Sequence, residues 1–329
     1  MTRRLPARVR RDPARVRRDP ARVRRLPVRL PANRKVRCGL FILLALVLVA
    51  AFGPLLVGHV LGQSPTRLHA GGTLEPPSGG HWLGTTSSGQ DVLAQLVAGT
   101  RTSLLVGLVG GTIATVLAVL LGVLSGYSTG RSGAGLTAFV NIFLVIPGLP
   151  LLILVAGYTR GRGGWLTVAV IIGLTSWAGG ARAKRAQTLS LRGRDFVTAA
   201  TYSGESRARV LLIEVVPHLA PVIASTFLFS VVGSIAAEAG LDFIGAGHAG
   251  TVSWGTMLYW VQSQGALQSG AWWWFLPPGL CIALVGTAAG LINFGVDELA
   301  DPRLRARAGT GSAAGRSRRT GGLTPEKAR

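Results

Sequence analysis

Long apolar runs separated by short polar segments fill most of the chain from residue 39 to residue 294. A helix that crosses the hydrocarbon core of a bilayer needs about 20 predominantly apolar residues. The runs that approach or exceed this length are 39–62, 102–127, 135–158, 164–180, 219–237 and 273–294. Pro147 and Pro150 fall inside the third run, and prolines kink transmembrane helices without forbidding them. The pattern therefore predicts an all-α membrane protein with six transmembrane helices.

Glycines recur inside the second run, at Gly107, Gly110, Gly111 and Gly122. Small residues of this kind let transmembrane helices approach one another closely. These positions therefore predict close packing between helices rather than a site for a ligand.

The longest polar interruption, residues 181–218, has the pattern of two short amphipathic helices joined by a glycine. Apolar and small residues recur at helical spacing over 195–203 and predict one contact face. This face consists of Phe196, Ala199, Ala200 and Ser203. Gly204 stands where a left-handed residue ends a helix, Ser206 can cap a second helix, and Pro217 is expected to turn the chain into the fifth span. The residues alone fit equally well an interfacial helix on the membrane and a helix that contacts a partner.

Composition places the chain in the membrane class, and the distribution of charge orients it. The 329 residues are 48% hydrophobic and only 15% charged, which is unusual for a soluble domain. Of the 35 Lys and Arg residues, 15 lie in residues 1–37, 8 in residues 302–329 and 7 in residues 181–218. Cytoplasmic segments carry the excess of Lys and Arg. Both tails and the 181–218 interruption are therefore predicted to be cytoplasmic, with 63–100 and 245–272 external.

The N-terminal tail carries a seven-residue repeat. The sequence "ARVRRDP" occurs at 7–13 and 14–20, and "ARVRRLP" follows at 21–27. A proline in every repeat prevents a continuous helix, and the few apolar residues do not suffice for a core. The net charge of +22 therefore fits lipid-facing tails better than nucleic-acid binding. The predicted organisation is a disordered basic cytoplasmic tail at 1–37, a first transmembrane helix at 38–62, an external segment at 63–100, a five-helix core at 101–300 that contains the 181–218 loop, and a basic cytoplasmic tail at 301–329.

The chain lacks the common sequence motifs of catalysis. The phosphate-binding G-x-x-x-x-G-K-[ST] motif of ATPases does not occur, nor do G-x-S-x-G or H-E-x-x-H. Cys38 and Cys281 form no metal-binding or disulfide framework, and the five histidines have no ligand spacing. We therefore expect a protein that is not an enzyme and that has no cofactor or metal of its own.

Several segments, in order along the chain, resemble one family. Residues 198–217, "TAATYSGESRARVLLIEVVP", are similar to the EAA motif of binding-protein-dependent ABC transporter permeases, with Thr198 in place of its usual Glu. The matching positions are Ala199, Ala200, Gly204, Val215, Val216 and Pro217. Residues 81–107 resemble the opening of the dipeptide/oligopeptide class, with Thr86 and Gln90 in place of its usual Asp and Arg. The segments that resemble the end of the fifth span, the external loop and the end of the sixth span are "AAEAGLDFIGAG" (236–247), "SWGTML" (253–258) and "DPRLR" (301–305).

The resemblance covers residues 81–305 and implies the type I ABC importer permease (MetI-like) fold. It implies that the 181–218 loop is a coupling helix that docks on a separate ATP-hydrolysing subunit. The residues that it assigns to this coupling loop are Thr198, Ala199, Ala200, Gly204, Arg207 and Pro217. The implied partners are a second homologous permease, one or two cytoplasmic ABC ATPase subunits that carry ATP and Mg²⁺, an extracytoplasmic binding protein and membrane lipids, but no nucleic acid. The implied location is the bacterial cytoplasmic membrane, which the chain crosses several times.

The cargo is expected to be di- or oligopeptides, with a nickel complex or another small solute as the alternative. A secondary transporter or channel subunit is a second class of function, because such proteins carry broken spans and Pro147 with Pro150 favours a break in the third run. A purely structural membrane subunit is the third possibility.

Glu238 lies at the end of the fifth run, one turn before Asp242. An acidic side chain at this depth is costly unless it is paired or hydrated. Glu238 is therefore a candidate gate or structural residue, which either makes a conformational contact near an external gate or is simply hydrated at the interface. Hydration is the favoured interpretation, and it predicts that Glu238→Gln leaves transport nearly intact.

Overall fold

The computed structural model describes residues 34–60, 62–158, 163–247 and 250–300. Within these residues the named elements are helices and none is a strand. Four helices are long and apolar enough to cross a membrane, and two bent helix pairs bring the candidate spans to 6. The predicted all-α class and the number of spans are therefore confirmed. The predicted tails lie outside the described residues, apart from residues 34–37.

The first two spans begin earlier than predicted. Helix α1 (Arg34–Leu55) continues into the π-helical turn η1 (Leu56–Val60) and starts inside the predicted basic tail, so the predicted boundary at residue 37 is wrong. Helix α2 (Val92–Tyr127) starts at Val92 rather than at residue 102. The reason is a cap, because an Asp91 carboxylate oxygen accepts a hydrogen bond of 2.7 Å from the Ala94 amide. With 36 residues, α2 is about 54 Å long and extends beyond the hydrocarbon core.

The third span is broken rather than kinked. Helices α3 (Gly130–Val145) and α4 (Gly148–Tyr158) meet at an angle of 83°. Ile146 ends α3 with an extended backbone, because the residue before a proline is pushed out of the helical region. Pro150 lies in the first turn of α4, where its missing N–H costs no helical hydrogen bond.

The fourth span continues well into the predicted loop. Helix α5 (Trp165–Thr175) and helix α6 (Ala178–Arg192) form a pair bent by 41°. Lys184, which the charge count assigned to a cytoplasmic loop, lies on α6 with only 1% of its surface exposed. Its ammonium group donates to the Thr226 hydroxyl. The predicted start of the loop at residue 181 is therefore wrong, because α6 carries the polar residues onward as a packed helix.

The fifth span also begins inside the predicted loop. Helix α8 (Arg207–Arg209), the π-helical turn η2 (Val210–Val215) and helix α9 (Val216–Phe243) form one continuous helix of 37 residues. Pro217 therefore lies inside this continuous helix, just after the π-helical turn η2; its ring removes one backbone hydrogen bond but does not end the helix. The expectation that Pro217 turns the chain into the span is therefore wrong.

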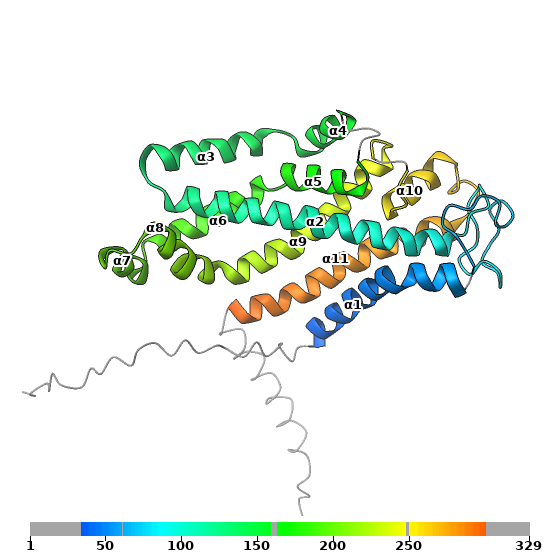
Figure 1. The fold of residues 1–329 in the computed structure, drawn as a ribbon, viewed down its shortest axis with the longest axis horizontal. Coiled ribbons are helices and arrows are strands. Elements are labelled where there is room, and N and C mark those ends of the chain that lie inside the picture. Colours follow the sequence, from blue (N-terminus) through cyan, green and yellow to red (C-terminus); the bar gives the residue numbers. More distant parts are fainter. Residues whose placement is uncertain (1–33, 61, 159–162, 248–249, 301–329) are drawn as a thin grey trace, which may run out of the picture.

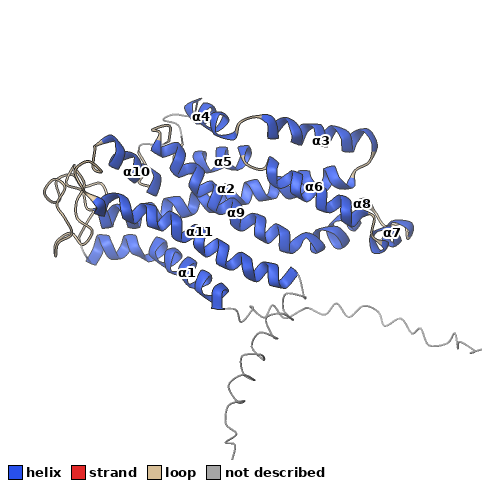
Figure 2. Cartoon of the chain, turned by 180° about the vertical axis from the view of Figure 1, so that it is seen from behind, coloured by secondary structure: helices blue, strands red, loops and turns tan. Residues whose placement is uncertain are grey.

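The helices form one elongated bundle with α2 along its centre (Figure 1). Helices α1 and α11 (Trp272–Ala300) lie side by side on one flank, and α5, α6 and α9 pack against α2. Helix α10 (Trp254–Ser263) and the 62–91 segment lie at one end, here called the α10 end. Helix α7 (Asp195–Tyr202) lies at the opposite end, here called the α7 end (Figures 1 and 2).

Glycines of α2 allow the closest approaches in the bundle. A Cβ atom added to Gly111 would lie 2.7 Å from the backbone nitrogen of Val231 in α9. A Cβ atom added to Gly122 would lie 2.5 Å from the carbonyl oxygen of Ala181 in α6. Both distances are shorter than carbon atoms tolerate, so the predicted role of these glycines in helix packing is confirmed.

Candidate functional site

The helix–turn–helix pattern around Gly204 is present in the structure. Helix α7 spans Asp195–Tyr202, as the spacing predicts, and Gly204 follows with φ of +80° in the left-handed region. The Ser206 hydroxyl oxygen accepts a hydrogen bond from the Arg209 amide and caps the next helix. The sequence therefore identifies this turn correctly, although the second helix is the beginning of a span.

The predicted contact face of α7 is divided between the protein interior and the surface. Val197 is 2% exposed, and Phe196 and Ala200 pack beside it in a cluster with residues of α2 and α9. Ala199, by contrast, is exposed. The expectation that Phe196, Ala199 and Ala200 share one docking face is therefore wrong, because α7 uses two of them to attach itself to the bundle.

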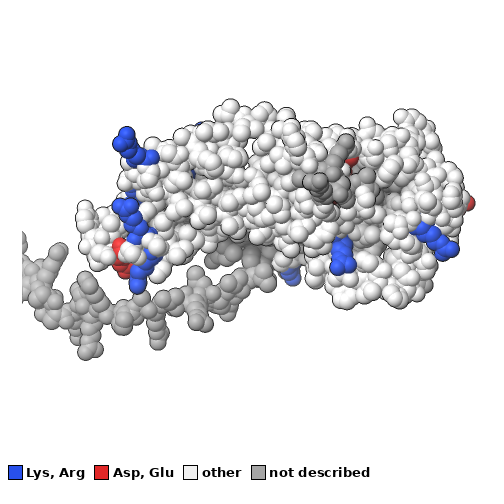
Figure 3. All heavy atoms as spheres, turned by 45° about the horizontal axis from the view of Figure 1, so that its top comes forward, with Lys and Arg blue, Asp and Glu red and all other residues white. Residues whose placement is uncertain are grey.

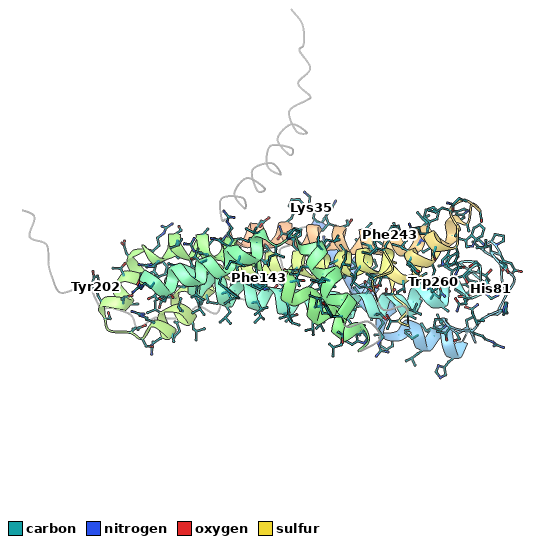
Figure 4. All side chains as sticks on the ribbon, turned by 90° about the horizontal axis from the view of Figure 1, so that it is seen from above. Lys35, His81, Phe143, Tyr202, Phe243 and Trp260 are labelled. Atoms are coloured by element: carbon teal, nitrogen blue, oxygen red, sulfur yellow. The ribbon has the colours of Figure 1, made fainter. Side chains whose placement is uncertain are left out.

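The outward face of α7 carries Thr198, Ala199 and Tyr202. Tyr202 is 87% exposed and lies at the tip of the bundle, away from the labelled residues at the other end (Figure 4). The Thr198 hydroxyl donates to the carbonyl oxygen of Arg194, one turn back in the chain. Thr198, which stands in the place of the usual Glu, is thus hydrogen-bonded to the backbone at the start of α7. The outward face of α7 is therefore nearly neutral.

A groove of about 530 Å³ runs beside α7 and brings two of the predicted site residues together. Thr198 and Arg207 line it, together with Tyr127 at the end of α2. Several Lys and Arg side chains, with acidic ones beside them, gather at this end on the left of Figure 3. At this end Arg209 forms an ion pair with Glu205, with 3.4 Å between the Arg209 nitrogen and the Glu205 carboxylate oxygen. Pro217 is exposed on α9 and does not line this groove.

Glu238 belongs to a buried polar cluster near the other end of the same continuous helix. It is 3% exposed and accepts a hydrogen bond of 3.2 Å from the Ser103 hydroxyl of α2. The Ser103 oxygen in turn accepts from the Trp254 amide of α10, at 3.1 Å. One turn beyond Glu238, the Asp242 carboxylate accepts from the Ser253 hydroxyl at 2.7 Å. The favoured interpretation of Glu238 as a hydrated interfacial residue is therefore wrong.

The Glu238 cluster ties three elements together. The Trp254 indole donates to the Thr100 hydroxyl of α2 at 3.2 Å. The backbones come so close that a Cβ atom on Gly99 would lie 3.1 Å from the carbonyl carbon of Ser253. Because a buried charge or polar group is costly without a partner, any relative movement of α2, α9 and α10 has to rearrange these contacts together.

Sequence reasoning missed the roles of Ser103, Trp254 and Lys184. Ser253 and Thr256 form a capping box at the start of α10, and the only signal for it in the sequence was Ser253, a residue type favoured at the N-cap of a helix. Ser103 lies in the 81–107 segment that the family resemblance covers, but the sequence does not show its role or that of Lys184, because both roles come from contacts between distant helices. Within the described part of the chain, no three His, Cys, Asp or Glu side chains are grouped to hold a metal ion.

Comparisons with known proteins agree with these features. Residues 118–306 match the family described as binding-protein-dependent transport system inner membrane component. The chain is 33% identical over 280 residues to the dipeptide transport system permease protein DppC of Bacillus subtilis, with 84% of each chain covered. It is 32% identical to the oligopeptide transport system permease protein OppC of Mycobacterium tuberculosis, over 80% of this chain and 88% of that one.

A solved structure is also similar to part of the chain. It is the MetNI methionine ABC transporter in an inward-facing conformation, with 20% sequence identity and a TM-score of 0.47. The likeness covers 63% of this chain and 94% of that one. At this TM-score it carries no further argument, and the family assignment rests on the sequence matches.

Proposed function

This chain belongs to the binding-protein-dependent family of transport-system inner membrane components, and we propose that it imports di- and oligopeptides as one of two permease subunits. The observation that carries the proposal is its 33% identity to a dipeptide permease over 84% of its length. Permeases of this family are subunits of a larger transporter, and they lack an ATPase motif of their own. We therefore assign the binding of ATP and Mg²⁺ to one or two cytoplasmic ABC ATPase subunits. We assign the delivery of the peptide to the permease to an extracytoplasmic binding protein.

We assign the α7 end to the cytoplasm and the α10 end to the external side. Support comes from the exposed basic residues at the α7 end, because cytoplasmic segments carry the excess of Lys and Arg. These residues are Arg194, Arg207 and Arg209. Both termini are cytoplasmic in this arrangement of six spans.

We assign to α7 the contact with the ATPase. A short helix at the tip of the bundle, with Ala199 and Tyr202 exposed and no bulky charge between them, is a suitable shape for a groove in a partner. Its inner side is attached firmly, because Val197 packs with Val123 of α2 and Val215 of η2. A force on α7 is therefore passed to both long helices rather than absorbed in a loose loop.

The continuous helix from Arg207 to Phe243 gives this force a route through the membrane. Its 37 residues extend about 55 Å, from beside α7 to the Glu238 cluster. A tilt of this helix at the α7 end moves Glu238 relative to Ser103 and Trp254 at the α10 end. We propose that the cluster holds the external side in one state and rearranges when the ATPases close.

The break between α3 and α4 was the feature that favoured a secondary transporter or channel. Family membership decides against that class, because relatives across most of the chain are permeases of transport systems. The sharp bend has a local cause in Pro147 and does not require a substrate site.

The experiment that tests the proposed function is purification of the tagged chain from its native membrane, followed by identification of what accompanies it. We expect a second permease, one or two ABC ATPases and a binding protein, and we expect that binding protein to retain di- or oligopeptides. Retention of a nickel complex and no peptide would replace the proposed cargo. Purification of the chain without any ATPase would contradict the proposed transporter.

A further inference from the structure

The groove of about 530 Å³ beside α7 is here called the α7 groove. Its walls come from the end of α2, the end of α6, helix α7 and the continuous helix that begins with α8. Leu124, Val197 and Leu211 give it an apolar part, and Tyr202, at the tip of the bundle in Figure 4, marks its outer edge. The volume is within the range of about 300–1,000 Å³ for ligand pockets, so the groove has room for a few side chains of a partner.

Two arginines line the α7 groove, and neither has a partner within the described residues. Arg192, at the end of α6, is half-buried, and Arg207, at the start of α8, is exposed. No described side chain or carbonyl group accepts a hydrogen bond from either guanidinium, and no described carboxylate pairs with them. No Asp or Glu lines the groove, and Glu205 nearby is paired with Arg209. The groove therefore holds two positive charges that the described part of the chain does not neutralise.

Hydroxyl groups add further donors to the α7 groove. Tyr127, Ser128 and Thr129 line it at the end of α2, and their hydroxyls make no hydrogen bond within the described residues. Thr198 and Thr201, by contrast, donate to backbone carbonyl oxygens one turn back in the chain. A guanidinium has only donors, and a hydroxyl can donate as well as accept. The lining therefore favours an anionic acceptor, either a carboxylate or a phosphate, which Arg can bind through two parallel hydrogen bonds.

The position of the groove along the fifth span favours a protein carboxylate over a lipid phosphate. The uninterrupted apolar run of this span begins at Leu219, and Arg207 lies 12 residues before it on the same continuous helix. At about 1.5 Å per residue this separation is about 18 Å along the helix. The headgroup layer on one side of a bilayer is only about 5–8 Å thick. Arg207 therefore lies beyond the lipid phosphates, on the side that the proposed function assigns to the cytoplasm.

The α7 groove is continuous with the outward face of α7. Thr198 and Tyr202 belong to both, and together with Ala199 they give that face no charge. A partner that covers this face therefore also reaches the two arginines of the groove. Complementary charges steer encounter and fix the register of an interface, which the uncharged residues of α7 cannot do.

We propose that the α7 groove receives a segment of the ABC ATPase subunit that carries carboxylate side chains, and that Arg192 and Arg207 pair with them. The small side chains of α7 supply the close contact, and the two arginines supply the charge attraction that orients it. This inference rests on the proposed function, because it assumes that the partner at α7 is the ATPase. It goes further by assigning the positive charges of the interface to this chain and the negative charges to the ATPase.

The first test removes both charges from the groove and measures binding of the ATPase. Arg192→Gln and Arg207→Gln are combined in the complete permease pair, which is titrated with the ATPase in about 0.1 M and about 1 M salt, where the screening length falls from about 10 Å to about 3 Å. We expect the double variant to bind at least about tenfold more weakly than the wild type in low salt. The difference should shrink in high salt, because salt screens the charges that the variant lacks. The thermal midpoint without ATPase should not fall, because neither arginine has a described partner to lose.

Arg131→Gln is the matched control for this titration. Arg131 is exposed at the start of α3, at the same end of the bundle, and does not line the groove. Its variant should keep the affinity and the salt dependence of the wild type. Arg207→Gln alone, at an exposed position, decides the question if the double variant does not fold. Wild-type affinity in the groove variants, or an equal loss in Arg131→Gln, would overturn the inference.

The second test identifies the group that faces the arginines. Arg207→Lys keeps the positive charge and supplies an amine, which a water-soluble carbodiimide joins to a touching carboxylate as an amide while the carbodiimide becomes a urea. We expect mass spectrometry to find position 207 linked to an Asp or Glu of the ATPase, and no such link from position 131 in Arg131→Lys. Links from position 207 only to other parts of this chain would overturn the inference.

The remaining outcomes separate this inference from a lipid site and from the proposed function. If the groove variants keep their ATPase affinity but no longer bind vesicles of phosphatidylglycerol, the groove is a lipid site and the inference is overturned. If the wild-type permease pair binds no ATPase at all, the proposed function fails. If it binds the ATPase while the groove variants match the wild type, only the inference fails.

Discussion

Substitution of Ala199 by Asp separates attachment of the ATPase from stability of the fold. Ala199 is exposed on α7, so the variant should keep the native structure. The intrinsic helix propensity of Asp costs at most about 0.7 kcal/mol relative to Ala. If α7 docks in a groove of the ATPase, the same carboxylate is buried there without a partner. That costs about 2–5 kcal/mol, which corresponds to a loss of affinity from about 30-fold to several thousand-fold.

The neighbouring residue shows why the structure is needed for this choice. Ala200 has the same side chain but packs in the cluster of Val197 and Val215. Ala200→Asp therefore places a charge in the protein's own interior and lowers stability and docking together. The sequence alone gave no reason to prefer Ala199 over Ala200.

The assay is a titration of the purified permease pair with its ATPase, alongside thermal unfolding of the permease pair alone. Ala70→Asp is the matched control, because Ala70 is also exposed but lies in the 62–91 segment at the α10 end. We expect Ala199→Asp to lose the ATPase while Ala70→Asp retains it, with similar thermal midpoints for both. Wild-type affinity of Ala199→Asp for the ATPase would refute the assignment of α7 as the docking helix.

Three further predictions test the orientation and the two ends of the continuous helix. Single cysteines at Ser78 and Ser190, in a background without the native cysteines, should react with an impermeant reagent in intact cells only at Ser78; the reverse result would invert the topology. Gly204→Val should destabilise the α7 turn by about 1–2 kcal/mol, because φ is +80° there, and it should reduce ATPase binding. Gly204→Asn should be nearly neutral, because Asn tolerates this backbone conformation. Equal effects of the two substitutions would contradict the left-handed turn at Gly204. Glu238→Ala should lower the thermal midpoint and transport, because it leaves the buried Ser103 hydroxyl without its acceptor, at a cost of about 1–3 kcal/mol; an unchanged midpoint with normal transport would show that the buried cluster has no role.

The apolar runs were sufficient to predict the class of the fold and the number of spans. Hydropathy measures whether a segment can face lipid, and this property is local to the segment. The limits of the spans depended on other features. The Asp91 cap extended α2 towards its N-terminus, and Pro147 broke the third span instead of bending it.

The candidate site was predicted in its local geometry but not in its orientation. The left-handed Gly204 and the capping Ser206 followed from residue types that have strong backbone preferences. The inward side of α7 could not be predicted in this way, because both sides of this short helix carry small residues. Only the position of α2 decides which side is covered. Lys184 and Glu238 were misjudged for a related reason. Their partners, Thr226 and Ser103, lie on other helices and far away in the sequence.

ATP-driven uptake of a labelled tripeptide into proteoliposomes tests the central claim most directly. The complete set of partners is reconstituted with the binding protein on one side and ATP on the other, and uptake is compared with that of this chain alone. We expect trialanine to accumulate only when the second permease, the ATPases and ATP are all present, and we expect Ala199→Asp to abolish accumulation. Accumulation by this chain alone, or accumulation that continues without ATP hydrolysis, would contradict the account.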